Sequence, residues 1–231
     1  MIFDREIALI GVDKYQILKD SHVMVVGLGG VGSYTVEALA RSGVEEISII
    51  DFDTVSDTNI NRQLIALHST IGRPKVDVVE ERLLDINPNI VVHKYNMFVD
   101  NNTIKDIDFS NVSYICDAID NVNAKILLIQ KSKELNIPII SSMGTGNKLD
   151  PTKFQIADIN QTKYCPLAKR IRLELKKLEI KDVKVLYSTE EPYKSSIYEN
   201  NKVVPMSISF VPSVAGLLIA RYVILDIIKW V

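Results

Sequence analysis

One stretch decides the fold: His22-Val23-Met24-Val25-Val26-Gly27-Leu28-Gly29-Gly30-Val31-Gly32-Ser33. It starts as an apolar run typical of a buried strand, and Gly27, Gly29 and Gly32 have the G-x-G-x-x-G spacing of a nucleotide-binding turn. The first glycine allows a sharp bend, the second lets a phosphate approach the backbone, and the third lets the helix pack on the strand. Bare amides and the dipole at the helix N-terminus attract the anion. The stretch predicts a phosphate-binding loop, with a glycine turn that binds nothing as the alternative.

The segments around this loop alternate between strand and helix patterns. Glu46–Ile50 is a second apolar strand, and Asp51 follows it at the spacing expected for a carboxylate that accepts from a ribose hydroxyl. Further expected elements are strands at Ile90–Tyr95, Tyr114–Asp120 and Ile137–Ser142, helices at Lys75–Ile86 and Asn123–Leu135, and an antiparallel strand at Phe154–Ile159. This alternation predicts an α/β, Rossmann-like, doubly wound and mainly parallel sheet with an antiparallel C-terminal extension. Ligands bind at the carboxyl ends of the strands in that fold, where Asp51, Asp53 and Asp120 are expected.

The composition is that of a globular protein. The 231 residues carry a formal net charge of −2, which argues against a surface that is basic overall. We expect one domain over 1–231, with an ATP-binding half at 1–147 and a substrate-facing half with a C-terminal helix at 148–231. The two cysteines, Cys116 and Cys165, predict no disulfide framework and exclude a four-cysteine zinc site. Met1–Glu6 carries charge where a signal peptide would be apolar, so the expected compartment is the cytoplasm.

The C-terminal segment Ile208–Val231 is largely apolar, which raises the question of a membrane. A spanning helix needs about 20 predominantly apolar residues. This segment is interrupted by Pro212, Arg221, Asp226 and Lys229. We therefore expect a buried helix from about Ser213 and no membrane partner, with membrane attachment as the alternative.

A long polar segment, Asp51–Gln63, follows the second strand. A dehydrogenase would explain the glycine motif but not this segment. Arg62 and Lys75 can neutralise phosphates that a nicotinamide dinucleotide lacks. Asp53 and Asp120 are candidate Mg²⁺ ligands, because hard cations prefer carboxylate oxygens. Each residue alone is also explained as a solvated loop charge, but together around a nucleotide loop they favour ATP over NAD.

Five motifs then resemble a known family. They are Gly27-Leu28-Gly29-Gly30-Val31-Gly32-Ser33, Asp51-Phe52-Asp53-Thr54-Val55, Asn59-Ile60-Asn61-Arg62-Gln63, Gly72-Arg73-Pro74-Lys75 and Asp117-Ala118-Ile119-Asp120-Asn121. In this order they are similar to the ThiF/MoeB/HesA adenylating family, which is related to the ubiquitin-activating enzymes. The resemblance implies a homodimer that binds ATP and Mg²⁺ and adenylates a carboxylate, with release of pyrophosphate.

The same resemblance implies roles for individual residues. The implied nucleotide-binding set is Gly27, Gly29, Gly30, Gly32, Asp51, Asp53, Asn59, Arg62, Gln63, Lys75, Asp120 and Asn121. In it the glycines cradle the phosphates, Asp51 holds the ribose, and Asp120 binds Mg²⁺. The implied catalytic residues are Arg62, Lys75 and Asp120, together with Arg5, which resembles an N-terminal arginine that reaches the partner subunit's ATP site. A surface charge on a helix is the alternative for Arg5.

The second half of the chain narrows the substrate. It lacks the two Cys-x-x-Cys pairs with which sulfur-carrier-activating members hold zinc, so no zinc is expected. Ser142–Thr152, Cys165–Ala168, Tyr187–Pro192 and Ser209–Gly216 look like the branch that dehydrates threonylcarbamoyladenosine in tRNA. That branch implies adenylation of the threonyl carboxylate and ring closure by the carbamoyl group of the same side chain. Two alternatives stay open: adenylation of the C-terminus of a ubiquitin-like sulfur-carrier protein, and an NAD-dependent oxidoreductase or nucleotide-sensing module.

A basic segment and one cysteine bear on the partners. The tRNA-binding candidates, around an expected helix within Thr162–Leu178, are Lys163, Lys169, Arg170, Arg172, Lys176 and Lys177. Phosphate contacts supply most sequence-independent affinity for RNA, although a solvated helix face explains these charges equally well. Cys165 would serve a thioester or a persulfide, and hence a sulfur-handling partner of the cysteine desulfurase type, but the cyclisation needs no such nucleophile. Cys116 is expected to pack inside its apolar strand.

Overall fold

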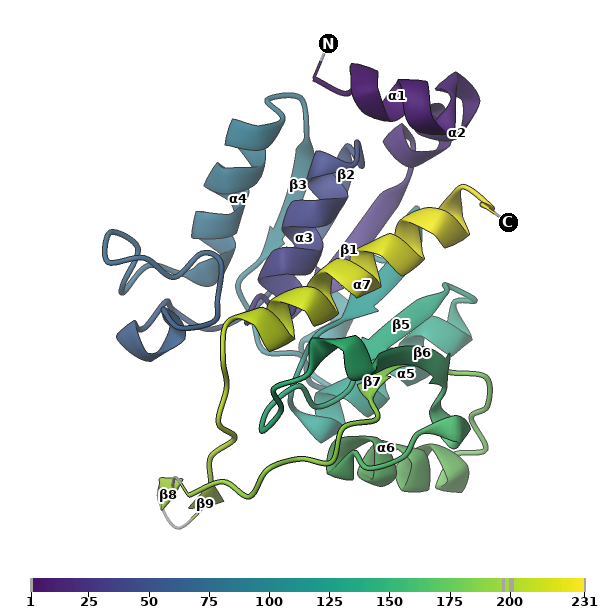
Figure 1. Cartoon of the computed structure of the whole chain (residues 1–231). Coiled ribbons are helices and arrows are strands. Elements are labelled where there is room, and N and C mark those ends of the chain that lie inside the picture. Colours follow the sequence, from purple (N-terminus) through teal and green to yellow (C-terminus); the bar gives the residue numbers. More distant parts are fainter. Residues whose placement is uncertain (1, 197, 200–201, 231) are drawn as a thin grey trace.

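A seven-stranded sheet runs through the centre of the molecule, with helices on both of its faces (Figure 1). The computed structural model describes residues 2–196, 198–199 and 202–230. The strands of the sheet are β1 (His22–Val26), β2 (Glu46–Ile50), β3 (Val91–Tyr95), β4 (Val112–Asp117), β5 (Ile139–Ser142), β6 (Phe154–Asp158) and β7 (Lys184–Ser188). Two further strands, β8 (Tyr198–Glu199) and β9 (Lys202–Val203), pair with each other.

The strand order is β3-β2-β1-β4-β5-β7-β6. Neighbouring strands are parallel from β3 to β7, and β6 runs antiparallel to β7 at the edge. The chain order reverses between β1 and β4, so the carboxyl ends of these two strands form the switch point where ligands bind in this type of fold. The topology confirms the predicted fold class. Strands from both halves of the chain share one sheet.

Helices cover both faces of the sheet. The described α-helices are α1 (Asp4–Ile10), α2 (Val12–Lys19), α3 (Gly32–Arg41), α4 (Lys75–Ile86), α5 (Val122–Glu134), α6 (Pro166–Lys177) and α7 (Phe210–Ile227). Short 3₁₀ turns are η1 (Asp57–Asn59), η2 (Ile104–Asp106), η3 (Pro151–Lys153) and η4 (Ile159–Gln161). Apolar residues of α3, α4 and α7 pack on one face, and those of α5 and α6 pack on the other.

The central strand β1 shows why its sequence is apolar throughout. Val23 and Val25 belong to the core on the α3 side, whereas Met24 and Val26 belong to the core on the α5 side. Side chains of a strand alternate between the two faces, so a strand covered on both faces has no solvent-facing position. The short loop after it therefore starts from a rigid, fully buried support.

The C-terminal helix α7 contributes buried side chains to the core, although less than half of it is buried. It is long and apolar enough to pass a test for a membrane span by length and hydropathy, with 39% of the tested window buried. Its buried positions include Ala215, Ile219 and Val223, which join the core on the α3 side. A Cβ on Gly216 would lie 2.3 Å from the Val31 carbonyl oxygen, so α7 and α3 approach closely.

Several predicted boundaries differ from the structure, and the two largest differences are of three residues. The fourth strand was expected to continue to Asp120, but β4 ends at Asp117. The Asp117 Oδ1 accepts from the amide of Ile119 at 3.1 Å, which turns the chain away from the sheet. The C-terminal helix begins at Phe210 instead of near Ser213. Pro212 does not delay it, because a proline in the first turn of a helix removes no helical hydrogen bond.

Candidate active site

The glycine loop joins β1 to α3 at the switch point. Gly27 has a φ of 89°, and a Cβ there would lie 2.8 Å from the carbonyl oxygen of Ala118. A Cβ on Gly32 would lie 1.7 Å from the Gly27 carbonyl oxygen, so only glycine lets the helix start this close to the strand. Within the described part of the chain, the amides of Gly29 and Gly30 donate to no acceptor. These N–H groups are therefore available to a phosphate.

Asp51, directly after β2, is buried and fastens the glycine loop. Its Oδ2 accepts from the amide of Leu28 at 2.6 Å, and its Oδ1 accepts from the amide of Asp53 at 2.8 Å. Burial raises the pKa of Asp51, and the Lys75 ammonium and the two amides oppose that rise. Each carboxylate oxygen can accept a second hydrogen bond. Asp51, the residue predicted to bind the ribose, is thus held in a fixed orientation, and its carboxylate oxygens can still accept a hydrogen bond from a ligand.

Lys75 opens α4 and lies between the two acidic residues. Its Nζ is 2.7 Å from Asp53 Oδ2 and 3.9 Å from Asp51 Oδ1. The side chain of Lys75 is 5% exposed, whereas that of Asp53 is 46% exposed. The ammonium is held in place while its main partner faces solvent. Such an ammonium can pair with a phosphate, and the hydrated Asp53 can reach a cation bound to that phosphate.

The polar segment after Asp53 forms η1 and a turn with its own hydrogen bonds. The Asn59 Oδ1 accepts from the amide of Ser56 at 3.2 Å, which caps η1. The Arg62 Nη1 donates to the carbonyl of Thr58 at 2.7 Å and to the Asn61 Oδ1 at 2.9 Å. The Arg62 guanidinium is therefore held by its own loop, and its remaining N–H groups are available for a ligand.

Gln63 lies against the glycine loop and has an unused acceptor. Its Nε2 is 3.8 Å from the position that a Cβ of Gly29 would take. Its Oε1 is buried and has no hydrogen-bond partner among the described residues. An unpartnered buried acceptor costs about 1–3 kcal/mol, which a ligand hydroxyl or amino group would recover. Among the residues predicted to bind the nucleotide, Gln63 thus has a buried acceptor atom that a ligand could satisfy.

Asp120 and Asn121 lie in the loop after β4, which touches the glycine loop at Ala118. The Asp120 side chain is exposed. The Asn121 Oδ1 caps α5 by accepting from the amides of Asn123 and Ala124 at 3.0 and 3.1 Å. Asn121 therefore has a structural task that the sequence prediction did not include. Of the two, Asp120 is the side chain left to bind a cation.

A buried ion pair behind this loop was missed from sequence. Lys125 Nζ lies 2.9 Å from Asp117 Oδ2, and both side chains are 0% exposed. Ser141 donates to the same oxygen at 2.5 Å. One signal was available: Lys125 lies three and four positions before Leu128 and Ile129, on the apolar face of its helix. Because Asp117 also accepts from the Ile119 amide, the pair fixes the turn that leads to Asp120.

The basic residues proposed for RNA lie on and around α6. Lys163, Lys169, Arg170, Lys176 and Lys177 are exposed. Arg172 differs, because its Nη1 donates to the Thr162 Oγ1 at 2.6 Å and to the Thr162 carbonyl at 3.1 Å. Its guanidinium fastens the loop before α6. The other five cations are open to solvent.

Cys165 and Arg5 lie on elements other than those that carry the nucleotide residues. Cys165 is buried at the N-cap of α6, where its Sγ accepts from the Ala168 amide at 3.5 Å. Burial lowers the pKa of the nearby Lys148, and Cys165 opposes that shift. Arg5 is exposed on α1, near the end of the sheet where β1 begins, whereas the glycine loop lies at the other end (Figure 1).

The doubly wound sheet, the glycine loop at its switch point and the charged groups around that loop define a nucleotide-binding α/β protein. Contacts join Gly27, Leu28, Asp51, Asp53 and Lys75 into one group. The chain belongs to the ThiF family, whose profile matches residues 3–230.

Individual relatives cover nearly the whole chain. A tRNA threonylcarbamoyladenosine dehydratase of Bacillus subtilis is 43% identical over 240 residues, which cover 98% of this chain and 94% of that protein. The Escherichia coli enzyme of the same name is 40% identical over 73% of this chain and 63% of that protein. A crystal structure of the E. coli enzyme, TcdA, in complex with ATP aligns with a TM-score of 0.89 and 33% identity, over 98% of this chain and 93% of that one.

Proposed function

We propose that this protein is an ATP-dependent tRNA threonylcarbamoyladenosine dehydratase. The observation that carries the proposal is the match to the B. subtilis enzyme of that name, which extends over 98% of this chain. The group around the glycine loop supports the proposal. Backbone amides that can bind phosphate, a buried lysine and hydrated carboxylates lie at one edge of the sheet. An NAD-dependent oxidoreductase has no comparable support, since the similar TcdA structure is described as an ATP complex.

The chemistry requires that a carboxylate be made reactive. A threonyl carboxylate oxygen attacks the α-phosphorus of ATP, the bond to pyrophosphate breaks, and an acyl-adenylate forms. An atom of the neighbouring carbamoyl group then attacks the acyl carbon, and AMP leaves with the former carboxylate oxygen. The carbamoyl group gives up its proton, so the nucleoside loses the elements of one water. No second protein substrate is needed.

The protein's part in these steps is to position groups and to neutralise charge. The amides of the glycine loop and Lys75 would hold the phosphates, Arg62 would balance negative charge as pyrophosphate leaves, and Asp51 would orient the ribose. Asp120, and Asp53 with it, would hold Mg²⁺, which supplies charge neutralisation at the phosphates when bound. The exposed carboxylates at this edge fit a cation that prefers oxygen ligands.

The partners follow from the same proposal. The exposed cations of α6 and its preceding loop would contact tRNA phosphates. Arg5 belongs to α1, which lies at the end of the sheet opposite to the glycine loop of its own chain (Figure 1), so its role in catalysis requires a homodimer in which it reaches the partner's site. A sulfur-handling protein is a partner only if Cys165 carries an acyl group or sulfur, which cyclisation does not need. The cytoplasm stays the predicted compartment.

The direct test is ATP turnover by the purified protein with tRNA from cells that have or lack the threonylcarbamoyl modification. We expect pyrophosphate release and loss of one water from the nucleoside, followed by mass spectrometry, only with modified tRNA. Tight ATP binding without a mass change would instead favour activation of a carrier protein, tested with a small protein that ends in Gly-Gly and with Cys165→Ala.

Arg62→Ala tests the site within the same assay. Loss of a charge partner for the leaving pyrophosphate should slow adenylation by about two to four decades. Arg41→Ala is the matched control, since Arg41 pairs with Glu37 at the far end of α3 from the glycine loop. A rate for Arg62→Ala within about threefold of the wild type would show that Arg62 has been misassigned.

A further inference from the structure

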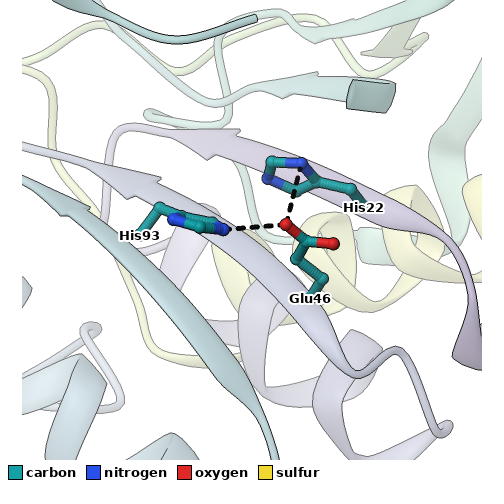
Figure 2. A group of neighbouring side chains, drawn as sticks. All are labelled: His22, Glu46 and His93. Atoms are coloured by element: carbon teal, nitrogen blue, oxygen red, sulfur yellow. Dashed lines mark hydrogen bonds and ion pairs between the residues drawn. The ribbon is translucent and has the colours of Figure 1, made fainter. Parts of the chain in front are cut away.

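Two histidines and a glutamate meet at the end of the sheet opposite to the glycine loop (Figure 2). His22 opens β1, Glu46 opens β2, and His93 lies in the middle of β3. In the parallel register His22 pairs with Glu46, and Ser48, two residues further along β2, pairs with His93. Because alternate residues of a strand share a face, these side chains project from the same face of the sheet.

The potential ligand atoms of the three residues converge. His93 Nε2 lies 2.8 Å from Glu46 Oε1, and His22 Nδ1 lies 3.5 Å from the same oxygen. The ligand atoms all lie within 4.8 Å of one another. The side chain of His22 is 6% exposed, whereas those of Glu46 and His93 are 39% and 41% exposed. The group is therefore closed around His22 and open to solvent around His93.

The imidazole of His22 has one satisfied nitrogen and one without a partner. Its Nε2 lies 2.8 Å from the Ser48 Oγ, while its buried Nδ1 has no hydrogen-bond partner among the described residues. If Nε2 carries the hydrogen and donates it to Ser48, the Nδ1 lone pair faces the Glu46 carboxylate. In that tautomer two acceptors face each other across 3.5 Å, and a cation between them would remove the repulsion.

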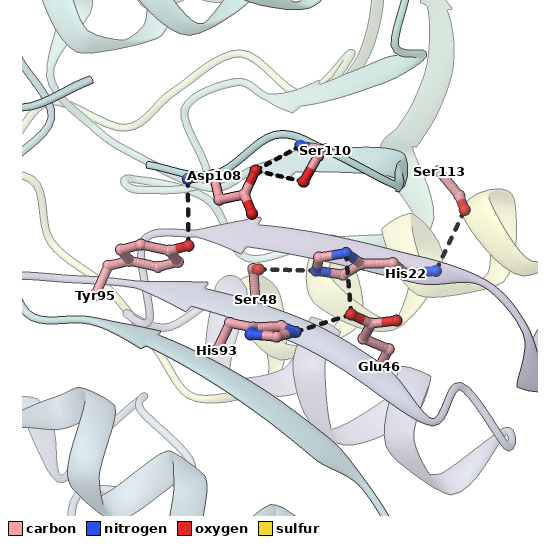
Figure 3. A network of polar contacts seen from close by, with 8 residues as sticks. All are labelled: His22, Glu46, Ser48, His93, Tyr95, Asp108, Ser110 and Ser113. Carbon is pink, nitrogen blue, oxygen red and sulfur yellow. Dashed lines mark hydrogen bonds and ion pairs between the residues drawn. The ribbon is translucent and has the colours of Figure 1, made fainter. Parts of the chain in front are cut away.

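The surroundings add negative charge and fixed orientation (Figure 3). Asp108 faces the group from the loop before β4 and interacts electrostatically with both histidines. Its Oδ1 accepts from the amide and the hydroxyl of Ser110 at 2.8 and 2.6 Å. The amide of Asp108 donates to the Tyr95 hydroxyl at 3.3 Å. The carboxylates of Glu46 and Asp108 thus lie beside the two imidazoles, and this negative charge favours binding of a cation.

We propose that His22 Nδ1, Glu46 Oε1 and His93 Nε2 bind a divalent transition-metal ion of the Zn²⁺ type. Ligand atoms about 2.0–2.1 Å from a tetrahedral Zn²⁺ are about 3.3 Å apart. The two distances to Glu46 Oε1, 2.8 and 3.5 Å, lie on either side of that value, and the two histidine nitrogens lie within 4.8 Å of each other. His93 carries its proton on Nδ1 when the metal is bound, and the exposed side leaves a fourth position for water.

The donor set decides the class of metal. Two imidazoles and one carboxylate suit Zn²⁺, Co²⁺ or Ni²⁺, whereas Mg²⁺ and Ca²⁺ prefer ligand sets made of oxygen. Ser48 supplies the outer hydrogen bond that fixes the ring of a metal-binding histidine. The site differs from the four-cysteine zinc centre that the sequence excludes. A metal here would join β1, β2 and β3 at the ends opposite to Gly27 and Asp51.

The test uses the full chain, stripped with a chelator and titrated with Zn²⁺ alone in a calorimeter. ATP is left out because it binds metals itself. The wild type should bind one Zn²⁺ per chain, and its thermal midpoint should rise by about 5–10 °C at free Zn²⁺ one hundred times its dissociation constant. His93→Gln and Glu46→Gln should each weaken binding by at least about 100-fold, because loss of an outer partner alone costs 10- to 100-fold.

The third histidine of the chain provides the matched control. His68 is exposed in the loop before α4, so His68→Gln removes an imidazole but should leave Zn²⁺ affinity unchanged. Co²⁺ in place of Zn²⁺ should give visible absorption bands that His93→Gln loses. The proposal fails if the wild type binds no Zn²⁺ tighter than about 100 μM, a weak affinity for a protein site, or if His93→Gln binds it as well as His68→Gln does.

Discussion

Two lysine–carboxylate pairs lie on either side of the glycine loop and differ in their access to water. After β4, Asp117 and Lys125 are 2.9 Å apart and both are 0% exposed. After β2, Lys75 is 2.7 Å from Asp53, whose side chain is 46% exposed. The distances are nearly equal, so exposure is what separates the two pairs.

The difference in exposure assigns the two pairs different tasks. Charges removed from water are costly unless they stay paired, so Asp117 and Lys125 cannot exchange partners for a ligand. Their pair fixes the turn that presents Asp120. Lys75 can exchange Asp53 for a phosphate, because the freed carboxylate returns to solvent. The same chemical pair thus serves as scaffold on one side of the loop and as a binding group on the other.

The largest expected effect comes from breaking the buried pair. Lys125→Met leaves the Asp117 charge buried, and Asp117→Asn leaves the Lys125 charge buried. Each change should lower the free energy of unfolding by about 3–5 kcal/mol, measured by urea denaturation. The double variant should recover most of that loss, because asparagine still accepts hydrogen bonds and methionine fits the apolar face of α5.

The double-mutant cycle contains its own check. If the double variant costs as much as the two single variants together, the pair makes no mutual contribution and the distinction between the two sites is lost. Ser141, which donates to Asp117, is unchanged in all variants, so its contribution cancels.

The next effect, on activity, comes from the exposed pair. Lys75→Met should slow pyrophosphate release with modified tRNA by about 10²–10³-fold, as for loss of one group that stabilises transition-state charge. Its cost in stability should be only about 1 kcal/mol, because Asp53 gains hydration. Equal losses of stability in Lys75→Met and Lys125→Met, with activity per folded molecule retained, would contradict the assignment.

The sequence predicts the parts of this molecule that depend on local pattern. The bounds of β1, β2 and α4 follow from apolar periodicity and from the glycine loop, and the structure places these elements at the predicted residues. The phosphate loop and Asp51 share a short stretch with a known spacing. Their proximity can therefore be predicted without a structure.

The parts that were missed depend on register and on contacts between distant segments. His22, Glu46 and His93 come from three strands, and only the pairing of those strands brings them together. The end of β4 is set by the turn at Asp117, which no local propensity marks. The task of Asn121 as a helix cap was open to prediction, because asparagine before an apolar helix is a common N-cap.

The smallest expected effect is a pH dependence of the free energy of unfolding, which arises from Asp51 and should distinguish Lys75 from Lys125. Burial raises the pKa of Asp51 in the folded state above its unfolded value. The folded state then binds more protons between these two pKa values, so this contribution to stability is present below the unfolded pKa and is lost as pH rises through the folded pKa. The unfolding free energy of the wild type, relative to Asp51→Asn, should therefore fall as pH rises through that window.

Lys75 and Lys125 should act differently on this slope. Lys75 opposes the rise in the pKa of Asp51, so Lys75→Met should extend the loss of stability to higher pH. Lys125 is not among the groups that shift the pKa of Asp51, so Lys125→Met should leave the change of unfolding free energy with pH as in the wild type. Urea denaturation from about pH 3.5 to 7 measures all three differences. A difference between wild type and Asp51→Asn that grows with pH would mean that Asp51 is stabilised as a carboxylate, and that the lysine outweighs burial at this site.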